Sequence, residues 1–66
     1  PHNLSEVIDG IIKIIRESDS ERVEAIINCS QTDYDIASPS KLVFCENCDI
    51  QKDIIIKPYG FVLFKD

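Results

Sequence analysis

The sequence LSEVIDGIIKIIRE, residues 4–17, sets the fold class that we expect for this chain. Its apolar residues recur at i, i+3, i+4, i+7, i+8 and i+11, which is the spacing of one face of an α-helix. They are Leu4, Val7, Ile8, Ile11, Ile12 and Ile15. Asn3 with Glu6 three residues later is a variant of the capping box, so the pattern predicts a helix over residues 4–17.

A second helix is predicted directly after the first. Ser18 and Glu21 repeat the capping-box spacing, and an apolar run follows them. This pattern predicts a helix over residues 20–28 and therefore a helical hairpin in the first part of the chain. A single helix that continues to Asn28 is the alternative, because the apolar residues of the two segments stay nearly in phase.

The C-terminal part has the pattern of strands. Residues 29–40 are mostly polar and are expected to form a connecting loop. Three later segments are short, rich in β-branched and aromatic residues, and separated by turn-forming residues. They are residues 41–45, 53–57 and 61–65. Pro58-Tyr59-Gly60 leaves so little chain between the last two segments that we expect a tight antiparallel hairpin there.

These segments predict one small α+β domain over residues 1–66, in which two N-terminal helices pack on a three-stranded antiparallel meander in the order ααβββ. Residues 1–28 would be the helical half, residues 29–40 the connecting loop and residues 41–66 the β half. A chain of 66 residues has little net stability from a single core, so such chains usually need a metal, a disulfide or a partner subunit.

Composition argues against two classes of partner. The chain has twelve acidic and seven basic residues and a formal net charge of -5, and its basic residues do not cluster. Because phosphate neutralisation needs clustered Lys and Arg, no nucleic-acid partner is expected. No apolar run is long enough for a membrane span. The three cysteines are an odd number, which favours reduced thiols in the cytoplasm or another reducing compartment inside the cell.

The motif CENC, residues 45–48, is the one place where residue types and spacing match known chemistry. It follows an apolar, strand-like run, as a zinc knuckle does, and Cys45 and Cys48 would supply two thiolate ligands. A closed structural zinc site needs four ligands. Cys29 is the candidate for the third ligand, and the fourth would come from His2, from a carboxylate such as Asp33 or Asp49, or from a second copy of the chain.

Two other interpretations of this motif do not involve a metal. A dithiol redox site normally begins a helix, whose N-terminus favours the first thiolate, whereas here Glu46 and Asp49 disfavour one. In the interpretation that we favour, Cys45 packs as a small hydrophobic residue at a strand end and Cys48 lies in a turn.

The last two predicted strands are apolar on both faces. A small antiparallel sheet with one solvated face should alternate apolar and polar residues, but residues 54–56 and 61–64 do not alternate. Two short helices can cover only one face, so the other face is left for a partner. The predicted contact residues are Ile55, Tyr59, Phe61, Val62, Leu63 and Phe64. A hairpin enclosed within one monomer is the alternative.

We therefore expect a non-enzymatic protein-interaction or regulatory module that self-associates, or docks as an acidic adaptor, through the hairpin of residues 53–65. No catalytic residue stands out, because the one histidine, His2, lies near the start of the chain and no glycine-rich phosphate loop is present. Zinc is the one candidate cofactor. A zinc-stabilised module and a dithiol redox protein are the alternative functions, and the sequence leaves open whether the chain is a complete gene product or an excised domain.

Overall fold

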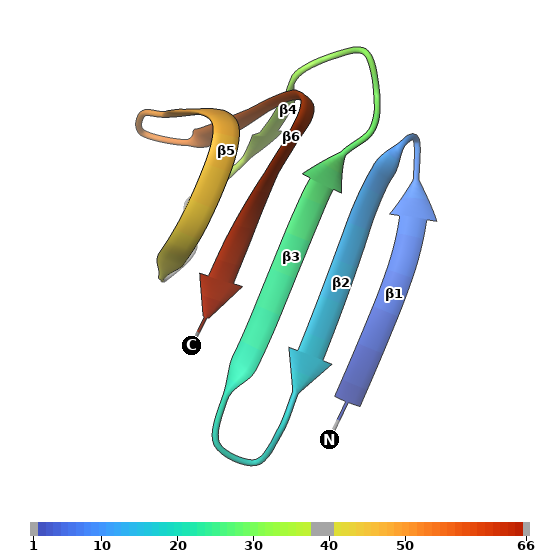
Figure 1. Ribbon diagram of the computed structural model, residues 1–66, viewed down its shortest axis with the longest axis vertical. Coiled ribbons are helices and arrows are strands. Elements are labelled where there is room, and N and C mark those ends of the chain that lie inside the picture. Colours follow the sequence, from blue (N-terminus) through green and yellow to red (C-terminus); the bar gives the residue numbers. More distant parts are fainter. Residues whose placement is uncertain (1, 38–40, 66) are drawn as a thin grey trace.

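The structure is a computed structural model that describes residues 2–37 and 41–65, and within them the chain forms strands and no helix (Figure 1). The strands are β1 (His2–Ile8), β2 (Ile11–Glu17), β3 (Arg22–Asn28), β4 (Tyr34–Ile36), β5 (Leu42–Ile50) and β6 (Ile54–Lys65). The predicted α+β fold is therefore wrong, and the described residues form an all-β domain. Within them, no helix is long and apolar enough to cross a membrane.

All strand pairs are antiparallel, and the long strand β6 organises them. Its C-terminal part, from Phe61 to Lys65, pairs with β3, and its first part, from Ile54 to Ile56, pairs with β4. Strand β5 pairs with the other edge of β6, while β2 and β1 extend the sheet beyond β3. The sheet curls as it crosses these strands and has the shape of a half-barrel (Figure 1).

The predicted helix over residues 4–17 is a β-hairpin instead. Asp9 and Gly10 both have positive φ, 53° and 81°. This is the conformation of a two-residue hairpin turn, for which Asp-Gly is a preferred sequence. The apolar residues of the two short strands lie on either side of this two-residue turn. Their positions in the sequence happen to recur every three or four residues, so they also fit the helical spacing. The β-branched isoleucines of β2 favour the extended chain over the helix.

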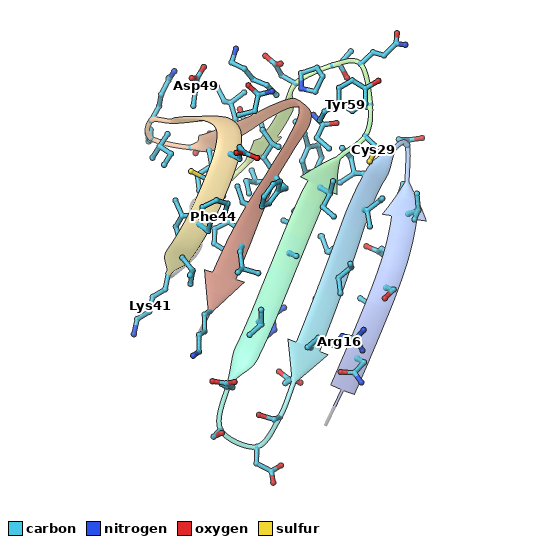
Figure 2. The ribbon with its side chains drawn as sticks, in the orientation of Figure 1. Arg16, Cys29, Lys41, Phe44, Asp49 and Tyr59 are labelled. Atoms are coloured by element: carbon cyan, nitrogen blue, oxygen red, sulfur yellow. The ribbon has the colours of Figure 1, made fainter. Side chains whose placement is uncertain are left out.

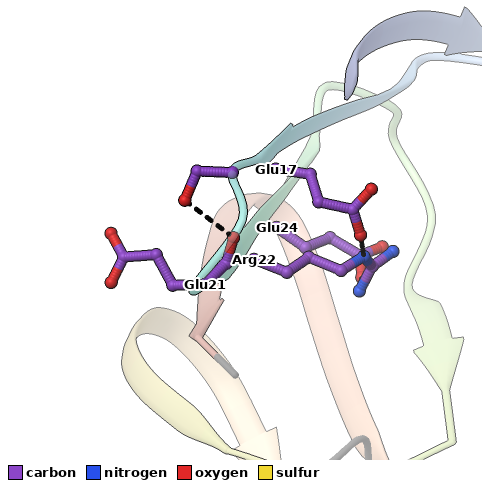
Figure 3. A network of polar contacts seen from close by, with 5 residues as sticks. Glu17, Glu21, Arg22 and Glu24 are labelled. Carbon is purple, nitrogen blue, oxygen red and sulfur yellow. Dashed lines mark hydrogen bonds and ion pairs between the residues drawn. The ribbon is translucent and has the colours of Figure 1, made fainter. Parts of the chain in front are cut away.

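The predicted helix over residues 20–28 is strand β3 instead. The alternative of one continuous helix to Asn28 is also wrong, because this part of the chain forms three strands. The Ser18 backbone N–H and Oγ both donate to the carbonyl oxygen of Glu21, at 2.9 and 3.4 Å, and so close the β2–β3 loop. Arg22 follows, with its guanidinium 3.8 Å from Glu17 Oε2 and 3.2 Å from Glu24 Oε1 (Figure 3). The Ser and Glu that resemble a capping box therefore flank a hairpin loop.

The predicted hairpin at Pro58-Tyr59-Gly60 is also wrong, because residues 54–65 form one continuous strand. The chain bends at this point, where Tyr59 has a φ of 65°. A Cβ at Gly60 would lie 2.5 Å from the carbonyl oxygen of Asn47, so β5 reaches this bend only because residue 60 has no side chain. In place of the predicted three-stranded meander, the chain forms two long strands, β5 and β6, which are joined by residues 51–53.

The predicted connecting loop, residues 29–40, contains a strand. Tyr34–Ile36 forms β4 and pairs with the first part of β6. The end of the predicted loop, residues 38–40, lies outside the described residues.

The core lies on the inner, concave face of the curled sheet. Its buried residues come from β3 and β6 and are Ile26, Ile54, Ile56, Val62 and Phe64. Partly buried residues of the other strands pack around them: Ile11, Tyr34, Ile36, Leu42, Cys45 and Cys48. Burial of these apolar side chains is the main term that stabilises the fold.

One polar side chain, Asn28, is fully buried at the end of β3. Its Nδ2 donates to the carbonyl oxygens of Thr32 and Ile56, both at 2.8 Å, and its Oδ1 accepts from the backbone N–H and Oγ of Ser30. These bonds fasten the loop after β3 to the first part of β6, and they satisfy the buried amide.

Candidate protein-binding face

The cross-strand register assigns each side chain to one face of the sheet, because directly opposite residues in an antiparallel pair share a face. Val7, Ile12, Ile27 and Phe61 form one row across β1, β2, β3 and β6. Ile14, Ala25, Leu63 and Phe44 form the neighbouring row, which ends on β5. Val23 lies next in β3 on the same face. We call these nine residues the apolar band; they lie on the outer, convex face.

Nothing in the described part of the chain covers the apolar band. The strands contact one another as hydrogen-bonded neighbours of one sheet, and residues 2–37 and 41–65 place no second layer on its outer face. None of the nine residues is buried, and Val7 and Phe44 are 67% and 51% exposed. The rings of Phe44 and Phe61 lie 5.6 Å apart between centroids and form the aromatic end of the band. A continuous, partly exposed apolar surface without a covering layer is typical of a protein-binding site.

Charged residues are divided unequally between the two faces. The carboxylates of β1, β2 and β3 all lie on the inner face by register: Glu6, Glu17 and Glu24. The outer face of these three strands carries one charged residue, Arg16, which lies near the β2–β3 loop (Figure 2). The part of the outer face that these strands form is therefore free of carboxylates, although the chain is acidic.

The neighbouring strands add charge around the band, where Asp35 and Asp49 lie opposite Ile55 on the outer side of the sheet. Lys65 lies on the outer side at the end of β6, with its Nζ 3.2 Å from Glu21 Oε2. Glu46 of β5 lies opposite Phe61, at the aromatic end. The centre of the band, around Leu63, thus keeps its apolar character.

The structure distributes the predicted contact residues over three environments. Phe61 and Leu63 belong to the apolar band, and Ile55 lies on the outer side of the first part of β6. Val62 and Phe64 are buried in the core. Tyr59 is 72% exposed at the bend of β6, at the opposite end of the molecule from Arg16 (Figure 2).

Sequence reasoning missed the part of the band that β2 and β3 contribute. It places Ile12, Ile14 and Ile27 in helices, with Ile12 on the apolar stripe and Ile14 off it. The Asp9-Gly10 turn is the signal that could have identified them as strand residues. Once these segments are read as strands, their apolar outer positions follow from strict alternation.

The structure brings Cys45 and Cys48 together on the inner face of β5, but not Cys29. Cys29 is exposed at the end of β3, where its N–H donates to the carbonyl oxygen of Gly10 (Figure 2). Within the described residues, no group of three or more His, Cys, Asp or Glu side chains is arranged to hold a metal ion. Partial burial, and then the neighbouring Cys45, raise the pKa of the Cys48 thiol above its ordinary value.

A cavity of about 470 Å³ opens on the inner face between the β1–β2 turn and the loop before β4. Apolar side chains, carboxylates, hydroxyl groups and one amine line it: Glu6, Ile8, Asp9, Ile11, Lys13, Ser30, Thr32, Asp33 and Tyr34. The Ser30 hydroxyl is already hydrogen-bonded to Asn28 and to the carbonyl oxygen of Thr32. The cavity therefore combines polar groups of both charges without a cluster that specifies one ligand.

Comparisons with known proteins do not connect this geometry to a relative: the chain matches no protein-family model, no curated protein and no solved structure.

Proposed function

We propose that this protein is a non-enzymatic interaction module that self-associates by packing its apolar band against the apolar band of a second copy. The observation that carries the proposal is the outer face of the sheet, where no second layer of the described chain covers the nine apolar residues. Burial of such a surface is the usual driving force of protein association. Two antiparallel sheets pack face to face in this way in β-sandwiches.

The size of the face suits a stable interface. The two larger dimensions of the molecule are 35 and 24 Å, and they bound the face on which the band lies. A standard interface buries about 800 Å² on each partner, so it would include the polar residues around the band as well as the band itself. A two-fold symmetric contact requires that the same patch serve both copies. An apolar band meets that requirement readily, because hydrophobic contacts do not depend on direction.

The charge distribution favours a second copy as the partner. Two copies of a chain with a net charge of -5 repel each other, and the repulsion is least where they approach through surfaces without carboxylates. The outer face of β1, β2 and β3 has none. Arg16 and Lys65 add positive charge at the edge of this face, where Lys65 pairs with Glu21.

The test is the molar mass in solution of the full chain and of Leu63→Asp, measured by sedimentation equilibrium over a range of concentrations. Leu63 lies in the middle of the band, and a two-fold contact would bury the introduced carboxylate twice. We expect the native chain to dimerise and the dissociation constant of the variant to rise by about 100-fold or more, as for a central interface residue.

Leu4→Asp is the matched control, because Leu4 is an exposed leucine on the inner face of β1. It should associate like the native chain. Far-ultraviolet circular dichroism should show the same strand content for both variants. A native chain that stays monomeric at every concentration would refute the proposal, and so would a Leu63→Asp variant that is folded and still dimeric.

A further inference from the structure

Cys45 and Cys48 point to the same face of β5 although they are three residues apart. In a regular strand, residues three apart lie on opposite faces. Here the register shifts between Glu46 and Cys48, where Asn47 has a φ of 54°. This bulge turns Cys48 inward, so that Cys45 lies opposite Val62 and Cys48 opposite Ile56, both of them buried residues of the core.

The bulge is held by contacts with the bend of β6. Asn47 Nδ2 donates to the carbonyl oxygen of Pro58 at 2.9 Å. The carbonyl oxygens of Glu46 and Asn47 approach Gly60 so closely that a Cβ there would lie 2.8 and 2.5 Å from them. The position of the two cysteines is therefore set by backbone packing between β5 and β6.

The two thiols are neighbours within this bulge. Cys48 Sγ lies 3.2 and 3.4 Å from the carbonyl oxygens of Glu46 and Phe61, to which its single S–H can donate, and Cys45 lies close enough to influence the pKa of the Cys48 thiol. Both side chains are only partly buried, so a small thiol reagent in solution can reach them. Two accessible thiols that share one face of a bulged strand can form a disulfide where side-chain rotation and the bulge bring the two sulfur atoms into bonding geometry.

We infer that Cys45 and Cys48 are a reversible dithiol, which a low-molecular-weight disulfide oxidises to a disulfide bond within β5. One cysteine thiolate attacks a sulfur of the reagent, forms a mixed disulfide and releases the first reagent thiolate. The other cysteine loses its proton and attacks the protein sulfur of that mixed disulfide, which releases the second reagent thiolate. The two protein thiols are thereby oxidised, and the reagent disulfide is reduced to two thiols.

This site is independent of the proposed self-association, because it lies on the inner face of the sheet. It also differs from a metal site, since two neighbouring thiols are sufficient for it. The disulfide between Cys45 and Cys48 would link the two sides of the bulge in β5. Its expected consequence is a more rigid β5–β6 pair, with a higher unfolding temperature for the oxidised chain than for the reduced chain.

The experiment uses the full-length Cys29→Ser chain, in which only the two neighbouring thiols are left. It is equilibrated with mixtures of reduced and oxidised glutathione, quenched with acid, and analysed by intact mass and by titration of free thiols. We expect loss of both thiols and of two hydrogen atoms, without a glutathione adduct. The chain should stay a single polypeptide under denaturing conditions.

Two further variants test the role of proximity. Cys29→Ser combined with Cys48→Ser should accumulate the glutathione adduct, because no second thiol can resolve it. The Cys48→Ser chain that retains Cys29 and Cys45 should behave in the same way, since those two cysteines lie apart. Glutathione adducts on both Cys45 and Cys48, disulfide-linked dimers of Cys29→Ser, or thiols that stay reduced under oxidising glutathione would each overturn the inference.

Discussion

The two faces of this sheet are built from alternate residues of the same strands, but the chain closes only one of them. On the inner face, the curl of the sheet brings β4, β5 and β6 around a core in which Ile56 and Val62 have no exposed surface. On the outer face, residues of equal size are left half-exposed in the apolar band. The comparison teaches that 66 residues can bury one side of a curled sheet without a second layer, but not both sides.

The sharpest way to test this difference is to make the same change at two adjacent residues. Ile56 is fully buried on the inner face, and Ile55 is half-buried on the outer face. Ile56→Ala should lower the free energy of unfolding by about 2–5 kcal/mol, because it leaves a cavity in the core. Ile55→Ala removes less contact and should cost about 1 kcal/mol or less. Denaturant unfolding, monitored by circular dichroism, measures the cost of Ile55→Ala and shows whether Ile56→Ala folds.

A domain of this size has little stability to lose, so Ile56→Ala alone is expected to be largely unfolded. Ile56→Val is the graded variant, with an expected cost of about 0.5–1.5 kcal/mol. Equal costs for the same substitution at residues 55 and 56 would contradict the assignment of these residues to opposite faces.

The inner face also depends on one amide. Asn28→Asp replaces the two N–H donors that face the carbonyl oxygens of Thr32 and Ile56 with an oxygen. The carboxylate would be repelled by both carbonyl groups, and we expect a loss of about 2–4 kcal/mol, close to the cost of unsatisfied buried polar groups. Thermal unfolding measures the loss. Gln31→Glu makes the same amide-to-carboxylate change at an exposed position of the adjoining loop, so it is the matched control and should change little.

At the bend of β6, Gly60 packs closely against the backbone of β5. Gly60→Ala would place a Cβ 2.5 Å from the carbonyl oxygen of Asn47, so the backbone of β5 or β6 must shift. We expect a cost of about 1–3 kcal/mol, typical of overpacking. Hydrogen exchange should show the effect in amides of residues 44–48 and 56–62 and leave those of β1 and β2 unchanged. Uniform loss of protection, or none, would contradict this role of Gly60.

The smallest expected effect is a dependence of stability on alkaline pH. Partial burial and the neighbouring Cys45 raise the pKa of Cys48 above its ordinary value of 9.0, so the folded state holds this proton more tightly than the unfolded state. The resulting stabilisation is fully present below that value and is lost as the pH rises through the raised pKa. Comparison of the unfolding free energy of native chain and Cys48→Ser across this pH range isolates the effect. Parallel curves would contradict it.

The apolar segments of this fold can be identified from the sequence, but not all of their geometry. The pattern predicts strands within residues 41–45, 53–57 and 61–65, and most of these residues do lie in β5 and β6. It predicts helix for residues 4–28 because apolar residues on two short strands, joined by a two-residue turn, recur at helical intervals. The Asp9-Gly10 turn and the β-branched isoleucines carry the opposite signal, and the structure follows them.

Other features depend on contacts between distant residues and cannot be read from local sequence. Pro58 and Gly60 are typical of a turn, but here Gly60 admits β5 to a bend in one long strand. The inward position of Cys48 depends on a bulge in which Asn47 bonds to Pro58, eleven residues away in the chain. The expectation that an apolar surface is left for a partner does not depend on the bend at Gly60 or the bulge at Asn47. It stays a proposal, and it now concerns the outer face of the sheet.

The most direct test of that proposal is methyl NMR of the isoleucines with a soluble paramagnetic agent, at low and at high protein concentration. Ile12, Ile14 and Ile27 report on the apolar band, and Ile26, Ile54 and Ile56 report on the core. If the bands pack together, relaxation of the first three methyl groups by the agent will fall as the concentration rises, and that of the last three will stay low throughout. Outer-face methyl groups that the agent relaxes equally at every concentration would contradict self-association through this face.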